Sequence, residues 1–145
     1  MNNFKLDSRL DNDCITLGKL NNSLLLLMNN ALLPWFILVP ITSESEIIDL
    51  PLNEQHQLHD EINLLGSFVK NNFKISKLNI AAIGNVVKQL HIHIVGRDPS
   101  DYCWPNVVWG TTEREPYSEL RINEIISSLT KQIGSAFNTK TIIKG

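Results

Sequence analysis

The chain has 145 residues, of which 43% are hydrophobic and 19% are charged, a balance typical of a folded globular protein. Its 13 Lys and Arg residues against 15 Asp and Glu residues give a formal net charge of −2, so composition gives no reason to expect a nucleic-acid partner. The two cysteines, Cys14 and Cys103, form no Cys-x-x-Cys motif, which argues against a disulfide framework and a cysteine-built zinc site.

The length favours a single domain, and no stretch rich in Gly, Ser or Pro divides the chain. The longest apolar run, residues 24–28, is far shorter than the roughly 20 residues of a membrane-spanning helix. Residues 1–5 carry neither an apolar signal core nor a basic leader. We therefore expect a cytoplasmic protein with no membrane partner.

Three strands are predicted first, over residues 14–20, 23–28 and 35–39. The pair Asn21-Asn22 between the first two suits a tight hairpin turn, because asparagine tolerates left-handed backbone conformations. Pro40 stops the third strand. The connections are short, so neighbouring strands should pair antiparallel.

The hydrophobic period becomes helical over residues 52–71, after a loop over residues 43–50. The apolar stripe of this helix consists of Leu58, Ile62, Leu65 and Val69. His56 and His59 lie on the same helix without the His-Glu-x-x-His arrangement of a zinc helix. We expect these two histidines to be solvated.

Two further strands are predicted over residues 78–83 and 86–95, joined by a turn at Gly84-Asn85. Residues 98–110 read as irregular, and Pro116 opens a second helix. The apolar face of that helix consists of Ile122, Ile125, Ile126, Leu129 and Ile133.

The predicted order of elements indicates an α+β domain in which a helix covers one face of an antiparallel sheet. We place the body of the domain in residues 1–110. Residues 111–145 add a C-terminal helix and tail to the same domain.

Alternation of polar and apolar residues is strong in the last predicted strand from Gln89 onward. One face carries Leu90, Ile92 and Ile94, and the other carries Gln89, His91 and His93. Three interpretations of the polar face remain open. It is an ordinary half-exposed strand, a metal site that needs a third ligand, or a catalytic site where one neutral imidazole attacks and the other donates hydrogen bonds.

The run Gln89-Leu90-His91-Ile92-His93-Ile94-Val95 resembles the motif of the HIT (histidine triad) nucleotide hydrolases and transferases, His-φ-His-φ-His-φ-φ with φ apolar. Three other stretches resemble the same family: Gly84-Asn85 before the motif, Gly96-Arg97 after it, and Leu33-Pro34-Trp35-Phe36-Ile37-Leu38-Val39-Pro40 upstream. The Gln at the first triad position resembles a bacterial subgroup of the family. The resemblance implies a HIT-like fold, with a five-stranded antiparallel sheet and two helices, usually in a homodimer.

The resemblance also implies catalytic roles. His91 aligns with the family's nucleophile, which attacks the α-phosphorus of a nucleotide and forms a nucleotidyl-histidine that water cleaves. The far ring nitrogen of His91 is then expected to donate to a main-chain carbonyl. His93 is expected to bind phosphate oxygens, with Gln89 and Asn85 in support.

For the rest of the substrate, the resemblance suggests Asn79 near the ribose or phosphate and Asn29, with Asn30 in reserve, at the ribose hydroxyls. An amide can both donate to and accept from a diol. The implied partner is a small nucleotide, with a purine expected. The mechanism needs no cofactor and no metal.

The chain departs from the family pattern at three positions. Gln89 replaces the first triad histidine, Trp35 replaces a common histidine, and Val86 replaces a frequent Ser or Thr. An amide cannot take up a proton near pH 7, and losing a general acid–base group costs about 10²–10⁴-fold in rate. A nucleotide-binding protein with weakened catalysis is therefore the main alternative, and a structural homodimer is a third.

Four other residues have open or secondary roles. Arg97 is expected to pair with an aspartate just after it, rather than to neutralise phosphate. Lys88 faces away from Gln89 by strand alternation, which leaves it outside the predicted site. Trp104 and Trp109 could cap the pocket, stack on a base or cover a dimer surface, and the sequence does not distinguish these three roles.

Overall fold

The structure, a computed structural model, describes residues 3–139, so the end of the predicted C-terminal tail, residues 140–145, lies outside it. The described part contains a six-stranded antiparallel sheet with the strand order β4-β5-β3-β2-β1-β6. The strands are β1 (Cys14–Leu20), β2 (Ser23–Met28), β3 (Trp35–Pro40), β4 (Lys77–Ala81), β5 (Ile92–Arg97) and β6 (Phe137–Asn138).

The prediction of five strands is wrong, because β6 pairs with the outer edge of β1. This strand is two residues long, Phe137 and Asn138, and so short a segment has no periodic pattern to detect. Phe137 is buried and belongs to the core on the helical side of the sheet. The strand therefore fastens the chain after α3 back onto the sheet.

The β1–β2 hairpin forms as the sequence predicts, with the predicted bounds of both strands confirmed. Asn21 in the turn has a φ of 51°, which is the left-handed conformation that asparagine tolerates better than most residues. Strand β3 extends one residue beyond the prediction, to Pro40, which pairs with Ser23.

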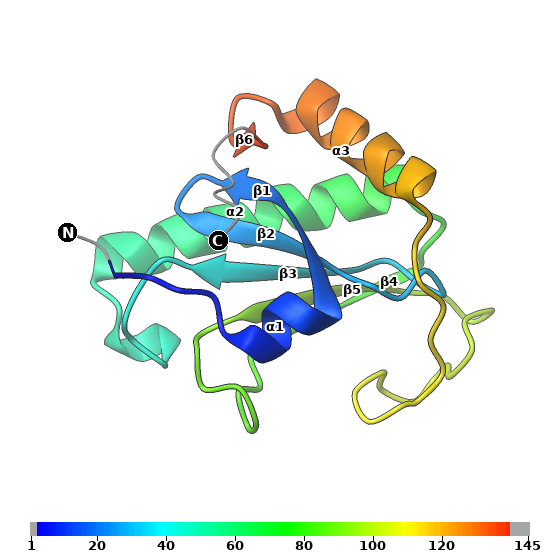
Figure 1. Ribbon diagram of the computed structural model, residues 1–145, viewed down its shortest axis with the longest axis horizontal. Helices are drawn as coiled ribbons and strands as arrows, with labels where there is room; N and C mark the ends of the chain where they lie inside the picture. The colour runs from blue at the N-terminus through cyan, green and yellow to red at the C-terminus, as the bar shows by residue number, and fades with distance from the viewer. Residues whose placement is uncertain (1–2, 140–145) are drawn as a thin grey trace.

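Helices α2 (Leu52–Asn72) and α3 (Glu119–Ile133) pack on one face of the sheet. Figure 1 shows α2 running behind the strands and α3 beside the β1 end of the sheet. Their buried side chains share one cluster with the sheet, including Leu58, Leu65, Phe68, Val69, Ile125, Leu129, Phe36, Leu38, Ile92 and Ile94. None of the helices found between residues 3 and 139 has the length and apolar character that crossing a membrane requires.

A side-chain cap sets the start of α3. Helix α3 begins at Glu119 instead of at Pro116, because the Ser118 hydroxyl accepts the main-chain N–H of Arg121 and forms the N-cap. Two short elements were not predicted, α1 (Ser8–Asp13) and the single 3-10 turn η1 (Ile47–Asp49). Both are too short to show a helical period.

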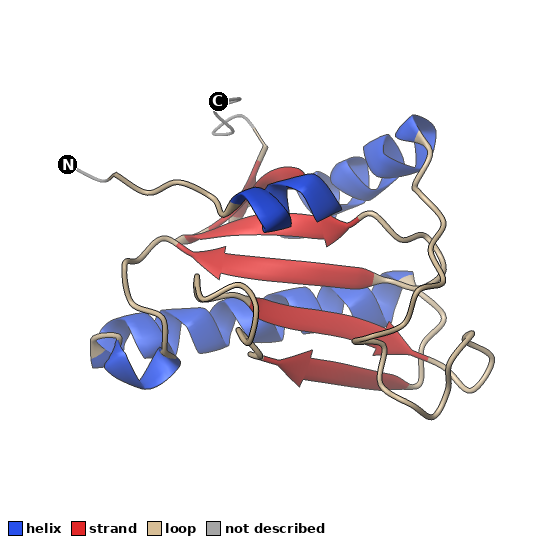
Figure 2. Cartoon of the chain, turned by 60° about the horizontal axis from the view of Figure 1, so that its bottom comes forward, coloured by secondary structure: helices blue, strands red, loops and turns tan. Residues whose placement is uncertain are grey.

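The other face of the sheet is covered by α1 and by the loop over residues 98–111, as Figure 2 shows from below. This second cluster gathers Leu10, Leu26, Leu33, Trp35, Ile37, Val39, Val95 and Val108. The sheet is thus a middle layer, with α2 and α3 on one side and α1 and irregular chain on the other.

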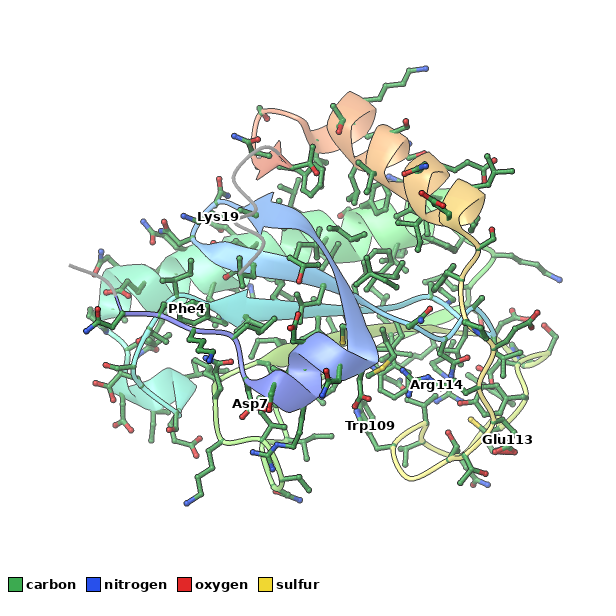
Figure 3. The ribbon with its side chains drawn as sticks, viewed as in Figure 1. Phe4, Asp7, Lys19, Trp109, Glu113 and Arg114 are labelled. Carbon is green, nitrogen blue, oxygen red and sulfur yellow. The ribbon has the colours of Figure 1, made fainter. Side chains whose placement is uncertain are left out.

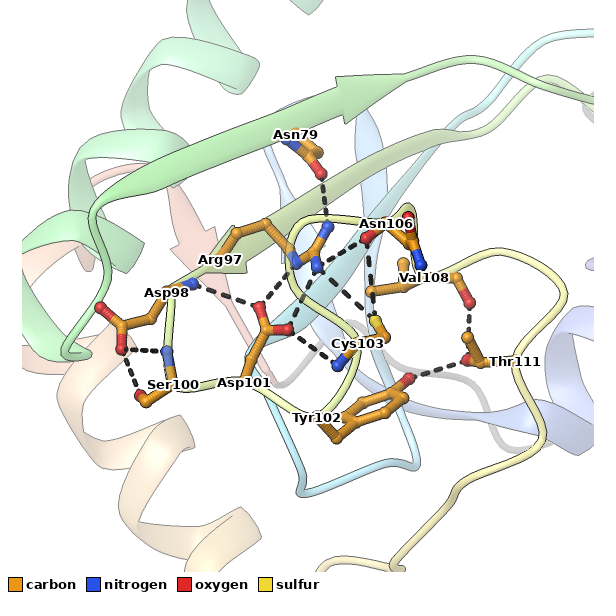
Figure 4. A network of polar contacts seen from close by, with 10 residues as sticks. All are labelled: Asn79, Arg97, Asp98, Ser100, Asp101, Tyr102, Cys103, Asn106, Val108 and Thr111. Atoms are coloured by element: carbon orange, nitrogen blue, oxygen red, sulfur yellow. Dashed lines mark hydrogen bonds and ion pairs between the residues drawn. The ribbon is translucent and has the colours of Figure 1, made fainter.

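Arg97 anchors the 98–111 loop (Figure 4). Its side chain is 2% exposed, and Nε donates to the Asp101 carboxylate at 2.8 Å. Nη1 donates to the amide oxygen of Asn79 at 2.9 Å, and Nη2 donates to the main-chain oxygen of Asn106 at 2.8 Å. The expected pairing of Arg97 with a following aspartate is confirmed, and the guanidinium is committed to holding the loop.

The last two predicted strands are shorter than expected. Strand β4 ends at Ala81, whose partner is His93, and β5 begins only at Ile92. The pairing between β4 and β5 therefore stops near His93, and residues 82–91 form an irregular connection. The predicted strand over residues 86–95 is wrong in its first half for this reason.

Candidate active site

Strand β5 sends its alternate side chains to opposite faces of the sheet, as predicted. Ile92 and Ile94 are 2% and 0% exposed in the helical-side core, which Leu90 joins from just before the strand. His93 lies opposite Ile37 of β3, on the face that carries α1 and the 98–111 loop. The core packing of the apolar row therefore fixes which way His93 points.

His91 and His93 come together at the start of β5. Their ring centroids lie 4.9 Å apart with the rings at 69°, and each residue is 6% exposed. Two imidazoles this close disfavour each other's protonated form. At least one of them is therefore held neutral.

The proton of His91 is placed by the main chain. Its Nδ1 lies 2.7 Å from the carbonyl oxygen of Gln89. A carbonyl oxygen can only accept, so Nδ1 carries the proton, and Nε2 of the neutral ring holds the free lone pair. The expected main-chain partner of His91 is present, and it does not depend on the side chain at position 89.

His93 has the opposite arrangement. The indole Nε1–H of Trp35 donates to its Nδ1 at 3.0 Å, so the proton of neutral His93 lies on Nε2. Burial, with a smaller effect of the neighbouring His91 charge, lowers the pKa of His93 to about 4. His93 is therefore a neutral hydrogen-bond donor through Nε2 at physiological pH.

Aromatic rings hold His93 from two sides. Trp35 and Trp109 lie with their centroids 5.9 Å and 5.3 Å from the His93 ring, and 6.1 Å from each other. Trp104, whose role the sequence also left open, lies instead against Arg97, with the guanidinium carbon 5.7 Å from its ring centroid. Sequence reasoning noted Trp35 as a departure from the family pattern but missed its bond to His93.

The Gln89 side chain ties the N-terminal segment to the start of β5. Its Oε1 accepts the main-chain N–H of Asp7 at 2.8 Å, and its Nε2 donates to the main-chain oxygen of Lys5 at 2.9 Å. Figure 3 shows Asp7 where this segment enters α1. Arg9 is the main cause that lowers the pKa of the Asp7 carboxyl, and the charge of His91 lowers it slightly further. Gln89 thereby holds the Asp7 carboxylate near enough to His91 for their charges to interact.

A cleft of about 370 Å³ opens beside His91. It is lined by Ser45 and Glu46 from the β3–α2 connection and by parts of residues 82–91, including Lys88. Lys88 lines this cleft, although strand alternation placed it on the face opposite Gln89, because residues 82–91 are irregular instead of forming a strand. The volume falls in the usual range of small-ligand sites.

Three of the predicted asparagines hold other segments of the chain through their side chains. The amide oxygen of Asn79 accepts from Arg97, and that of Asn29 accepts the main-chain N–H of Tyr117 at 2.8 Å. Asn30 holds the same C-terminal segment through Glu113 and Glu115. Asn85 is exposed beside Gly84, a lining residue of the cleft whose φ is 64°.

The α2 helix carries two further histidines. His56 and His59 are exposed, as expected. Within residues 3–139, no three or more His, Cys, Asp and Glu side chains gather where they could hold a metal ion. At the paired histidines, both Nδ1 atoms already have protein partners.

Comparison with known protein families matches more than half of the chain. Residues 9–100 match the sequence model of the HIT domain family. This stretch contains β1 to β5, both histidines of the site and Gln89. A search of the curated proteins found no match.

Solved structures of the same family resemble the chain over nearly its whole length. A histidine triad protein of Bradyrhizobium japonicum is 40% identical, covers 90% of this chain and 98% of its own, and superposes with a TM-score of 0.85. One from Sinorhizobium meliloti is 36% identical with the same coverage and a TM-score of 0.85. One from Marinobacter aquaeolei is 36% identical, covers 92% and 98%, and has a TM-score of 0.86.

A more distant likeness supports the fold alone. A hypothetical histidine triad nucleotide-binding protein of Sulfolobus tokodaii is 18% identical and superposes with a TM-score of 0.58. The sequence match and the relatives of 36% to 40% identity carry the assignment. The chain belongs to the HIT domain family.

Proposed function

We propose that this chain is a nucleotide hydrolase or transferase that acts at the α-phosphorus of a nucleoside 5′-phosphate derivative, through a nucleotidyl intermediate on His91. The observation that carries the proposal is the complementary protonation of the two histidines. His91 offers a lone pair at Nε2, because its Nδ1–H is given to Gln89. His93 offers a proton at Nε2, because its Nδ1 accepts from Trp35.

In the first step, the Nε2 lone pair of His91 forms a bond to phosphorus while the bond to the leaving group breaks. The leaving group departs with that electron pair, an anhydride oxygen as a phosphate anion and an amine nitrogen with a proton taken from solvent. The Gln89 carbonyl stays on Nδ1–H, so the positive charge that develops on the imidazole is met by a main-chain dipole at 2.7 Å. His91 therefore needs no separate base to become a nucleophile.

In the second step, water or another acceptor attacks phosphorus and the N–P bond breaks, with its electron pair returning to Nε2. Water loses its proton to solvent, and a nucleoside monophosphate is released. In both steps negative charge moves onto the non-bridging oxygens of phosphorus. His93 donates its Nε2–H to one of those oxygens, and burial keeps that donor free of competing water.

The cleft beside His91 admits the substrate. Asn85 is our candidate for a contact with phosphate or leaving group, because it is exposed beside the Gly84 turn. Asn79 and Asn29 are weaker candidates for the ribose, because their amide oxygens already have protein partners. Gln89 acts on His91 through its main-chain carbonyl.

Two finer parts of the proposal rest on the family resemblance, a purine base and a homodimer. Nucleotide binding is also what the Sulfolobus tokodaii relative is described as doing. For the homodimer, Ile80 on the edge strand β4 is 47% exposed, and an apolar edge strand is a surface that another chain can cover. Sedimentation equilibrium of the intact chain tests the dimer.

Turnover tests the activity. Wild-type protein and His91→Ala are incubated with diadenosine tetraphosphate and with adenosine 5′-phosphoramidate, and AMP is measured. We expect AMP from the wild type and none from the variant, while His59→Ala, on the exposed face of α2, keeps wild-type activity. If neither protein releases AMP but both bind it equally, the chain is a nucleotide-binding protein without turnover.

A further inference from the structure

We infer that this site selects leaving groups that depart as anions through a bridging oxygen, and that Lys88 is the residue that determines this specificity. The inference rests on the proposed function and extends it to the half of the substrate that is released. The triad motif alone does not predict whether a phosphoanhydride or a phosphoramidate is the better substrate, and the inference predicts the phosphoanhydride.

The site is short of proton donors for a leaving amine. Breaking a P–N bond places an electron pair on nitrogen, which must receive a proton as the bond breaks. A phosphate oxygen leaves as a stable anion and needs none, because its conjugate acid has a pKa of about 6 or lower. A site that lacks a general acid therefore discriminates against amines.

The paired histidines and Gln89 do not supply that acid. Gln89 is an amide, and its side chain is bonded to the main chain of Lys5 and Asp7. The proton on His91 Nδ1 is directed to a carbonyl, away from Nε2 and phosphorus. His93 is neutral, and a neutral imidazole N–H is a hydrogen-bond donor but a very weak acid.

A positive charge borders the cleft. Lys88 lines the same cleft as His91 and is exposed there. Among the residues that the structure describes, its ammonium group has neither a hydrogen bond nor an ion pair. A cation without a protein partner beside the nucleophile attracts a phosphate-bearing leaving group, whose charge it can neutralise.

Glu46 gives the inference an internal check. It belongs to the β3–α2 connection and lines the same cleft, and it makes no ion pair with Lys88. Its carboxylate repels an anionic leaving group, so its effect on specificity must have the opposite sign. Neutralising Lys88 should lower the preference for an anhydride, and neutralising Glu46 should raise it.

The experiment compares two adenylate substrates on the full chain. Diadenosine tetraphosphate releases a polyanionic nucleotide, and adenosine 5′-phosphoromorpholidate releases an amine. We measure kcat/KM for both with wild type, Lys88→Gln, Lys88→Arg and Glu46→Gln. Lys70→Gln, on the exposed end of α2, is the matched control for loss of one surface lysine.

We expect the wild-type kcat/KM to be about 100-fold or more higher for the anhydride than for the morpholidate, because the lack of a general acid slows amine release by roughly that factor. Lys88→Gln should lower that ratio about tenfold, Lys88→Arg should keep it, and Glu46→Gln should raise it. Equal use of both substrates, or a ratio that Lys88→Gln leaves unchanged in an active enzyme, overturns the inference and leaves the proposed function intact. No AMP from either substrate overturns the proposed function, and the inference with it.

Discussion

The main-chain carbonyl of Gln89 accepts the Nδ1–H of His91 at 2.7 Å, while the side chain of the same residue binds the main chain of Lys5 and Asp7. One residue thus connects the N-terminal segment to the proposed nucleophile. The carbonyl works whatever the side chain is, so the change from histidine to glutamine at this position leaves the tautomer of His91 in place. The side chain instead fixes a segment that the triad motif does not include.

Replacing Gln89 by alanine separates these two roles. Gln89→Ala should keep the His91 tautomer, and lowers the free energy of unfolding by about 1–3 kcal/mol through two lost hydrogen bonds. Amide hydrogen exchange should become faster over residues 5–13, with kcat falling less than tenfold. Gln132→Ala, an exposed glutamine bonded to Asn72 on the helical side, is the control. A loss of kcat beyond 100-fold would instead place the amide in the chemistry.

Replacing Trp35 by phenylalanine tests how His93 is held. Trp35→Phe keeps the aromatic contact but removes the indole N–H that caps His93 Nδ1. That hydrogen bond stabilises the neutral ring, so its loss should raise the pKa of His93 from its value of about 4 and free the proton to move between the nitrogens. We expect a 10- to 100-fold lower kcat. NMR titration of the His93 ring reads the pKa directly, and an unchanged titration contradicts the assigned bond.

The stability of the fold should depend on pH through His93. Its pKa is about 4 in the folded chain, against an ordinary value near 6.5, so the folded state binds fewer protons between these values. The stabilisation is fully present above pH 6.5 and is lost as pH falls toward 4, by roughly 3 kcal/mol. Urea unfolding at pH 7, 5 and 4 should show a smaller acid loss for His93→Gln than for wild type. If the free energy of unfolding falls equally with pH in both proteins, the low pKa of His93 is refuted.

The buried Arg97–Asp101 pair should be important for the loop that carries Trp109. Asp101→Asn removes a charge from a pair whose members are 2% and 4% exposed, which leaves Arg97 without its counter-charge. We expect a loss of about 3–5 kcal/mol in unfolding free energy and a change in tryptophan fluorescence. The control is Asp13→Asn, because the exposed Arg114–Asp13 pair at 3.9 Å is worth at most about 1 kcal/mol. Equal effects of both substitutions contradict this account.

The sequence predicts the regular parts of this fold well, because periodicity is a local property. The hairpin turn at Asn21, the two strands beside it and the helix starting at Leu52 all follow from it. The late start of β5 at Ile92 could not be predicted, since it depends on where β4 stops offering a partner. The strand at Phe137 was missed because only tertiary packing holds so short a segment in the sheet.

In the candidate site, too, the features that depend on local sequence could be predicted and those that depend on distant contacts could not. The motif places His91 and His93 together, and the carbonyl partner of His91 follows from the family's chemistry. The bond from Trp35 and the exposure of Lys88 to the cleft depend on contacts between segments far apart in the sequence. Asn29 could not be told from a residue that anchors another segment, since the same amide serves either purpose.

In the proposed mechanism His91 becomes covalently bonded to the nucleotide. The most direct measurement is mass spectrometry of wild type and His91→Gln quenched during turnover of diadenosine tetraphosphate, with the digest kept at alkaline pH, where phosphoramidate bonds to histidine survive. We predict one adenylyl group on the peptide that contains His91 in the wild type, and no adduct on the variant. AMP release by the wild type without any adduct on His91, or turnover retained in His91→Gln, would contradict the mechanism.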